Sequence, residues 1–325
     1  MSSLYPDLGT LLDAHGLTGR AEEPLIHSGY SGAALTKIVR GDGDRFVLKR
    51  MSIARDWIMR ATDDSACREA GFALSGVALG ERIRTPTVGA ARDNGGYALL
   101  MRDISDHLLP QNAITAAELD AIIEKMAELH SVPLPEARVV PWCGRRQRLL
   151  LLTPAGARVA ATYDAGVAPH LARGWALFDE LAPRPIVELI RALSEDPTPL
   201  IDLLASLPRS LLHGDLKFDN IGLDDAGRMW LIDWAMPMLA PPAVELGWFL
   251  AINSRRLPAT LDETTQRYTE AARIAPKLRA RHDAATVLCG LLLRGWRKAL
   301  DADDGEPGEL QWWCERAADA RRFLR

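Results

Sequence analysis

The chain has 325 residues, of which 48% are hydrophobic and 25% are charged, enough apolar material for a sizeable folded core. Its net charge of −4 excludes a general nucleic-acid-binding protein, and its four scattered cysteines, without a C-x-x-C pair, suggest neither a zinc site nor a disulfide framework. No apolar run reaches the roughly 20 residues that a bilayer span requires, so we expect a cytoplasmic protein without a membrane partner.

Strand-like segments open the chain. Residues 25–40 have the pattern of a strand, a glycine turn and a second strand, and residues 45–49 that of a third, which predicts antiparallel pairing. Glycines flank Ser31 in the first turn, so backbone N–H groups there can approach phosphate oxygens without a Cβ in the way. An ordinary hairpin turn is the alternative interpretation of this loop.

Lys49 ends the third strand on the side that faces the predicted cleft, although a lysine at a strand end is commonly a solvated edge residue. The following helical segment, residues 67–74, contains the carboxylate of Glu69. Between the two, residues 51–61 predict an extra helical turn or flap to which the sequence assigns no role.

A second hairpin completes the predicted sheet. Residues 87–91 and 97–101 flank an Asn-Gly turn, one of the stronger hairpin signals, so we expect five antiparallel strands. From residue 115 onward the apolar period changes to three and four residues, which indicates helices. His130, on the apolar face at the end of the first of these helices, is interpreted as a core or capping histidine.

The motif with the clearest chemistry lies between residues 211 and 234. Two short apolar strands flank a turn at residues 224–227. Antiparallel pairing would bring Asn220, just before the first strand, next to Asp233, just after the second. Asp215 lies on the loop that precedes them.

This order of Asp, Asn and Asp fits phosphoryl transfer from a nucleotide. Asp215 would orient the accepting hydroxyl and take its proton. Asn220 and Asp233 offer the hard oxygen ligands that suit Mg²⁺. Each residue alone is an ordinary turn former, but the ordered set is specific.

Segments 213–220 and 232–234 resemble the motifs of the aminoglycoside phosphotransferase and choline-kinase-like family of small-molecule kinases. The resemblance implies an α+β, bilobal, protein-kinase-like fold with a five-stranded N-terminal sheet, one helix beside it and a larger, mainly helical C-terminal lobe. Residues 1–104 would form the nucleotide-binding lobe, and residues 105–325 the lobe with the catalytic loop and acceptor pocket. A protein kinase would instead show His-Arg-Asp and Asp-Phe-Gly, from which Gly214 and Trp234 depart.

The resemblance also implies residue roles. Asp215 would be the catalytic base, and Asn220 and Asp233 the metal ligands. Lys49, held by Glu69, would bind the α- and β-phosphates. The other implied nucleotide contacts, in the glycine loop and the hinge between the lobes, are Gly29, Ser31, Gly32, Met101 and Asp103.

We therefore expect a Mg²⁺-dependent kinase that moves the γ-phosphoryl of ATP or GTP to a hydroxyl of a small molecule such as an aminoglycoside, sugar or amino alcohol. Lys217 would neutralise transferring charge beside Asp215, with a surface lysine as the alternative. A non-catalytic pseudokinase scaffold would be expected to lose Lys49, Asp215 or Asp233. A protein kinase would need a long docking segment, for which the stretch from residue 233 to 245 leaves no room, and no obligate protein partner is evident.

The acceptor pocket is less well specified by the sequence. Helical inserts at residues 141–208 and 309–325 are expected to wall it beside Asp215. Tryptophans at helical spacing are more commonly core residues. The aromatic and basic candidates for the wall are Trp142, Arg145, Arg146, Trp248, Trp296, Trp312 and Trp313.

Overall fold

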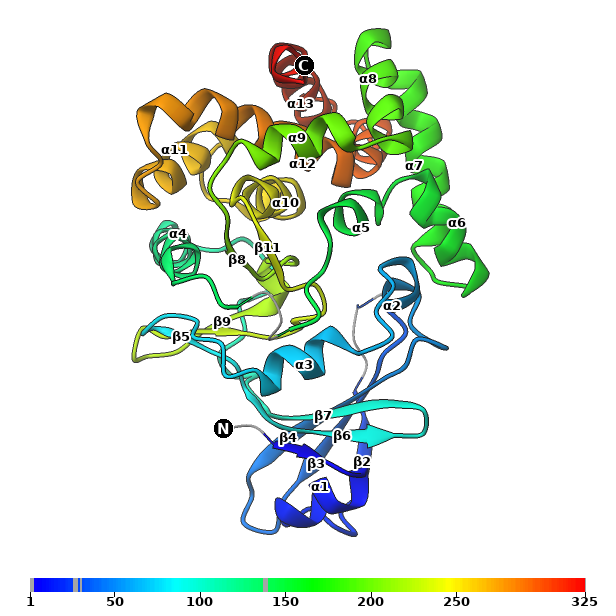
Figure 1. Cartoon of the computed structure of the whole chain (residues 1–325), viewed down its shortest axis with the longest axis vertical. Helices are drawn as coiled ribbons and strands as arrows, with labels where there is room; N and C mark the ends of the chain where they lie inside the picture. The colour runs from blue at the N-terminus through cyan, green and yellow to red at the C-terminus, as the bar shows by residue number, and fades with distance from the viewer. Residues whose placement is uncertain (1–2, 26–28, 30, 137–139, 325) are drawn as a thin grey trace.

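In the computed structural model, which describes residues 3–25, 29, 31–136 and 140–324, a sheet lies at one end of the molecule and helices at the other (Figure 1). The sheet has the strand order β1-β6-β7-β4-β3-β2. Its strands are β1 Ser3–Tyr5, β2 Glu22–Pro24, β3 Ala34–Val39, β4 Arg45–Met51, β6 Thr87–Asp93 and β7 Gly96–Arg102.

The sheet differs from the predicted one in its edges. Five strands pair antiparallel, but β1 adds a sixth that runs parallel to β6. Three residues are too short for an alternating pattern, which is why the sequence did not reveal β1. The first antiparallel strand, β2, ends at Pro24, before most of the segment predicted for it, and residues 26–28 and 30 of that segment lie outside the described part of the chain.

Helices cover both faces of the sheet. Helix α1 (Leu8–Ala14) lies on one face and α3 (Arg68–Leu74) on the other, with the short α2 (Trp57–Ala61) before α3 (Figure 1). Leu99 and Leu100, adjacent on β7, belong to the two separate cores on opposite faces. This alternation is the period of two that a strand imposes on its side chains.

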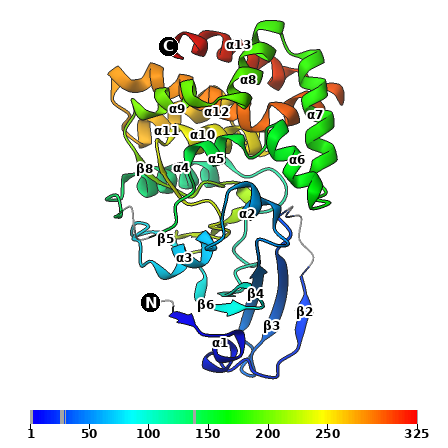
Figure 2. The ribbon, with the colours of Figure 1, turned by 45° about the vertical axis from the view of Figure 1, so that its right-hand side comes forward.

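The C-terminal lobe is built around one long helix, α12, which packs against α7, α10 and α13 (Figure 2). Its helices are α4 Ala116–Ser131, α5 Arg145–Leu150, α6 Pro154–Thr162, α7 Ala168–Leu181, α8 Arg184–Glu195, α9 Thr198–Ala205, α10 Ala243–Asn253, α11 Leu261–Ala271, α12 Pro276–Asp303 and α13 Gly308–Ala320. Helix α4 begins with the predicted Thr115–Glu118 capping box. No helix in the described ranges is long and apolar enough to cross a membrane.

Short strands and single helical turns lie between the sheet and the helices. The strands are β5 Ile83–Arg84, β8 Ser210–Leu212, β9 Ile221–Leu223, β10 Met229–Leu231 and β11 Met238–Ala240, and the 3₁₀ turns are η1 Phe218–Asn220, η2 Ser254–Arg256 and η3 Arg321–Phe323. One buried apolar cluster runs from Trp57 and Phe72 in the N-terminal part into the C-terminal helices. The two lobes therefore share a core where the short strands lie.

Candidate active site

The predicted hairpin is formed by β9 and β10, which pair antiparallel with Ile221 opposite Leu231. Its turn is closed by an N–H of Gly227 that donates to the Asp224 carbonyl at 2.9 Å. Beyond the strands, the Ile232 N–H donates to the Asn220 carbonyl at 3.1 Å. Asn220 and Asp233 therefore lie at the same end of the hairpin.

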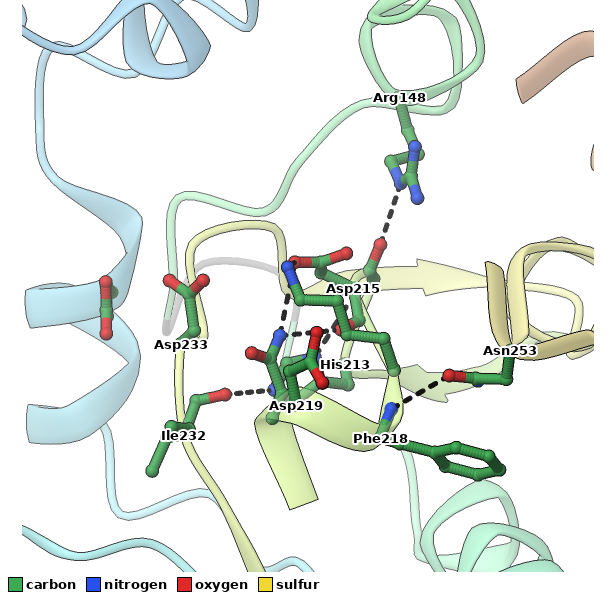
Figure 3. Close-up of polar contacts among 12 residues, drawn as sticks. Arg148, His213, Asp215, Phe218, Asp219, Ile232, Asp233 and Asn253 are labelled. Carbon is green, nitrogen blue, oxygen red and sulfur yellow. Dashed lines mark hydrogen bonds and ion pairs between the residues drawn. The ribbon is translucent and has the colours of Figure 1, made fainter. Parts of the chain in front are cut away.

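Asp215 lies on the loop between β8 and η1 and is buried. The Asn220 amide nitrogen donates to its carbonyl at 2.9 Å and to its carboxylate at 3.2 Å (Figure 3). Lys217 Nζ lies 3.2 Å from the same carboxylate, which raises the pKa of that lysine. The structure thus brings Asp215, Lys217 and Asn220 into direct contact.

Gly214 allows the chain to make this loop. Its φ is +83°, and a Cβ there would lie 1.8 Å from the Met236 carbonyl oxygen, so a larger residue cannot fit without moving the backbone. His213 is fully buried beside it and connects the two halves of the site. Its Nε2 bonds to the Ile232 carbonyl at 2.9 Å, and its Nδ1 accepts the Asp215 N–H at 3.2 Å, while burial lowers its pKa.

Glu245, in the first turn of α10, holds the loop from behind. Its carboxylate accepts the N–H groups of Gly214 at 2.6 Å and His213 at 3.2 Å. His130 Nε2 bonds to the same carboxylate at 2.9 Å, and Tyr268 bonds to the other ring nitrogen at 2.6 Å. Burial raises the pKa of Glu245, but these partners outweigh it and the net shift is downward. His130 is thus the core histidine that the sequence predicted, whereas the role of Glu245 went unrecognised.

Arg148, on α5, contacts the loop from the opposite side. Its Nε donates to the Gly214 carbonyl at 2.7 Å, as Figure 3 shows. The guanidinium lies 4.5 Å from the centre of the Trp248 ring, and its two terminal nitrogens have no hydrogen-bond partner among the described residues. Burial lowers the pKa of Arg148, an effect that the Asp215 charge opposes. Arg148 was not among the predicted wall residues, which included its neighbours Arg145 and Arg146.

Lys49 bridges the two lobes. Its Nζ lies 2.6 Å from Glu69 on α3 and 2.6 Å from Asp233 beyond the hairpin. Burial opposes the charge of Lys49, but the two carboxylates outweigh it and its pKa is raised. Burial raises the pKa of Glu69. Desolvation also opposes the charge of the partly exposed Asp233, but the charges of Lys49 and Lys217 outweigh it and hold the pKa of Asp233 low.

Asp233 has a left-handed backbone, with φ +65°, which is rare for a residue other than glycine. Such strain persists only where the surroundings fix it, and it recurs at functional sites. The side chain remains about one-third exposed, at 35%. Its carboxylate therefore faces Lys49 and is also open to a ligand.

The glycine loop is described in part, at Gly29 and from Ser31 onward. The Ser31 hydroxyl accepts the Ala33 N–H at 3.3 Å. Gly32 has φ +95°, and a Cβ there would lie 2.2 Å from the Arg55 carbonyl oxygen. Glycine is therefore required at position 32 both by conformation and by space.

At the predicted hinge, Met101 pairs with Val47 on one side and Thr87 on the other. The Asp103 N–H donates to the Arg45 carbonyl at 2.9 Å, and the Asp103 carboxylate accepts the Ser105 N–H at 2.9 Å. The backbone N–H of Asp103 is thus already used.

The helix α13 does not wall the loop of Asp215, contrary to the expectation for residues 309–325. Its apolar stripe, which includes Trp313, packs on α12 at the far end of the lobe (Figure 1). Trp248, Trp296 and Trp313 are buried core residues. Cavities of about 450 and 750 Å³ lie among the C-terminal helices, and neither is lined by Asp215.

No group of three or more His, Cys, Asp or Glu side chains within the described ranges could hold a metal ion. A Mg²⁺ ion bound with a nucleotide needs fewer protein ligands, because phosphate and water complete its shell. The Asn220 amide nitrogen faces Asp215, which leaves its oxygen free for such an ion, and Asp233 offers a carboxylate. The donor set therefore fits Mg²⁺.

Residues 25–283 match the phosphotransferase enzyme family. The chain belongs to this family. No curated protein sequence matches this phosphotransferase. The family assignment confirms the resemblance found in the sequence, and the arrangement of a sheet lobe and a helical lobe confirms the expected fold class.

Solved structures similar to this phosphotransferase include an ethanolamine kinase from Plasmodium vivax, at 13% identity and a TM-score of 0.50, over 96% of this chain and 86% of that chain. An aminoglycoside phosphotransferase from Alicyclobacillus acidocaldarius shares 18% identity at a TM-score of 0.48, over 96% and 92%. A choline/ethanolamine kinase family protein from Mesorhizobium loti shares 17% identity at 0.48, over 95% and 90%.

Proposed function

We propose that this phosphotransferase is a Mg²⁺-dependent kinase that moves the γ-phosphoryl of ATP or GTP to a hydroxyl of a small molecule. The observation that carries the proposal is the position of Lys49, 2.6 Å from both Glu69 and Asp233. A lysine held by a helix carboxylate binds the α- and β-phosphates in kinases. Membership of the phosphotransferase family supports the reaction class.

On the acceptor side, Asp215 orients the attacking hydroxyl and takes its proton as the oxygen bonds to the γ-phosphorus and the nucleoside diphosphate leaves. Lys217, 3.2 Å from Asp215, lies where it can neutralise charge on the transferred group. Because the transition state is loose, positioning contributes more than base strength. Glu245 and Arg148 keep the loop in place through the Gly214 backbone.

On the nucleotide side, we assign the phosphates to Lys49 and to the loop of Gly29, Ser31 and Gly32, and the base to the hinge from Met101 to Asp103. Asn220 and Asp233 would hold Mg²⁺, which neutralises phosphate charge when bound. The nucleotide-binding lobe then spans residues 1–104, and the acceptor lobe residues 105–325.

A small acceptor is favoured by the connection after Asp233. After Asp233 the chain forms β11, which pairs with β8, and then α10, where Glu245 holds the catalytic loop. Because these elements follow each other so closely, the chain has no long segment here on which a protein substrate would dock. The acceptor is therefore a compact molecule that reaches Asp215 from solvent.

The experiment is a screen of nucleoside diphosphate release with sugars, aminoglycosides, macrolides, choline and amino alcohols, beside generic protein substrates. We expect saturable turnover with a small hydroxyl compound and none with proteins. Nucleotide binding without turnover on any acceptor would favour a non-catalytic scaffold. Saturable labelling of a folded protein alone would favour a protein kinase.

A further inference from the structure

Residues 52–62 connect the glycine loop to the C-terminal lobe, and they overlap residues 51–61, the segment to which the sequence assigned no role. We propose that Tyr163 is a positioning residue that acts through this segment, holding the loop of Ser31 and Gly32 where the nucleotide phosphates bind. The inference rests on the proposed function, because it takes this loop as the phosphate site. We name residues 52–62 the bridge segment.

The bridge segment and the loop contact each other through their backbones. The Trp57 N–H donates to the Ser31 carbonyl at 3.2 Å. Gly32 approaches the Arg55 carbonyl so closely that a Cβ would lie 2.2 Å from its oxygen. With no side chain between the two backbones, a shift of the segment moves the loop.

Hydrogen bonds within the bridge segment hold it in one conformation. The Ser52 carbonyl accepts the N–H groups of Arg55 at 3.0 Å and Asp56 at 2.9 Å. The buried Asp56 carboxylate then caps α2 by accepting the N–H groups of Ile58 at 2.9 Å and Met59 at 3.0 Å. The turn and the helix therefore move as one unit.

The same segment also reaches the helix that carries Glu69. The Thr62 hydroxyl at its end accepts a hydrogen bond from the Arg68 guanidinium at 2.8 Å. Arg68 is buried, and Glu69 is the next residue along α3. The bridge segment thus contacts the glycine loop through Arg55 and Trp57, and the start of α3 through Thr62.

The bridge segment also contacts the C-terminal lobe, because its helix α2 lies beside α6 in both ribbon views (Figures 1 and 2). Tyr163 directly follows α6. Its hydroxyl donates to the Ile53 carbonyl at 2.9 Å and accepts from Arg60 Nε at 3.1 Å. One hydroxyl therefore fixes the bridge segment near both of its ends.

Phenylalanine at position 163 isolates this hydroxyl, because the half-buried ring that packs against the shared core is kept. The matched control is Tyr97→Phe, which removes the hydroxyl of another half-buried tyrosine, on β7, that packs on the same apolar cluster as Met59 but, among the described residues, makes no hydrogen bond to the bridge segment. Binding of Mg·ATP, Mg·GTP and the two free nucleosides is measured by calorimetry for wild type and both variants.

We expect Tyr163→Phe to weaken binding of the preferred triphosphate about 3- to 10-fold, the effect of one or two hydrogen bonds. The affinity for the matching nucleoside should equal that of wild type, because the nucleoside lacks phosphates. Tyr97→Phe should change the affinity for neither ligand. Equal losses for nucleoside and triphosphate would indicate a general structural role and overturn the inference, as would unchanged triphosphate binding.

Hydrogen exchange without nucleotide separates this inference from the proposed function. We expect Tyr163→Phe to speed exchange of the Trp57 amide, which donates to Ser31, while Tyr97→Phe does not. Unchanged exchange would overturn the coupling itself. If wild type binds no nucleotide, the proposed function fails together with the phosphate role of the loop, while the exchange result still decides whether Tyr163 holds it.

Discussion

The ring of Phe72 stacks on the ring of Trp234, with centroids 4.1 Å apart and planes 14° apart. Phe72 lies one helical turn after Glu69 on α3, and Trp234 directly follows Asp233. An aromatic contact between the lobes therefore lies beside both carboxylates that hold Lys49. Stacked rings contribute about 0.5–1.5 kcal/mol beyond the area that they bury.

Phe72→Leu should lower the free energy of unfolding by about 1–3 kcal/mol and also raise the KM for nucleotide, because Glu69 loses its register with Asp233. Phe178→Leu is the control, since Phe178 is also buried but packs on Trp175, away from Lys49. Urea unfolding and steady-state kinetics check both. If the two variants showed the same nucleotide KM, the stack would be structural only.

Asp215→Asn should lower kcat by on the order of 10²-fold or more while nucleotide affinity stays near wild type, because Asp215 serves the acceptor. Asp219→Asn, in η1 just after this loop, is the matched control, because Asp219 is more exposed and pairs with Arg256. Kinetics and calorimetry measure the two effects. A near-normal kcat in Asp215→Asn would remove this residue from its role.

Asp233→Ala should weaken nucleotide binding in the presence of Mg²⁺ and turnover together, since a metal ligand and a partner of Lys49 are lost at once. Asp225→Ala, in the exposed hairpin turn, should leave both unchanged. The readout is a Mg²⁺ titration of nucleotide binding. Wild-type metal dependence in Asp233→Ala would contradict the proposed metal site.

Glu245→Gln tests whether the charge of Glu245 stabilises the loop of Asp215, by means of the pH dependence of stability. The folded-state pKa of Glu245 is lowered from its ordinary 4.5, so its stabilising effect is present above that value and is lost as the pH falls through the folded pKa. We expect a loss of about 2–4 kcal/mol at pH 7, which shrinks below pH 4.5.

Urea unfolding at several pH values measures this difference, with Glu188→Gln as the control because Glu188 is exposed on α8. A stability gap between Glu245→Gln and wild type that did not change with pH would show that the charge of Glu245 contributes nothing.

Local patterns predicted much of the site. The hairpin after Asn220 follows from two apolar runs and a turn, whereas the pairing of Lys49 with Glu69 was expected from the resemblance to the kinase family. The supporting residues could not be predicted in this way. Glu245 and Arg148 act through contacts between segments far apart in the sequence, and such contacts leave no local period.

The lack of a local period also explains why one strand of the sheet was not predicted. Strands β3, β4, β6 and β7 alternate clearly enough to be recognised, whereas β1 is defined only by its partner β6. An acidic residue in the first turn of an otherwise apolar helix was the one available signal for Glu245. The sequence of the bridge segment indicated a helical turn. It could not indicate the contact with Tyr163, because Tyr163 lies in the other lobe.

The central claim is tested most directly by transfer of labelled γ-phosphoryl from ATP or GTP to small hydroxyl compounds, with products identified by mass spectrometry. Wild type should yield an acceptor that has gained one phosphoryl group on a hydroxyl, and Asp215→Asn should yield essentially none while it still binds nucleotide. Label found only on protein, or equal product from both enzymes, would contradict the account.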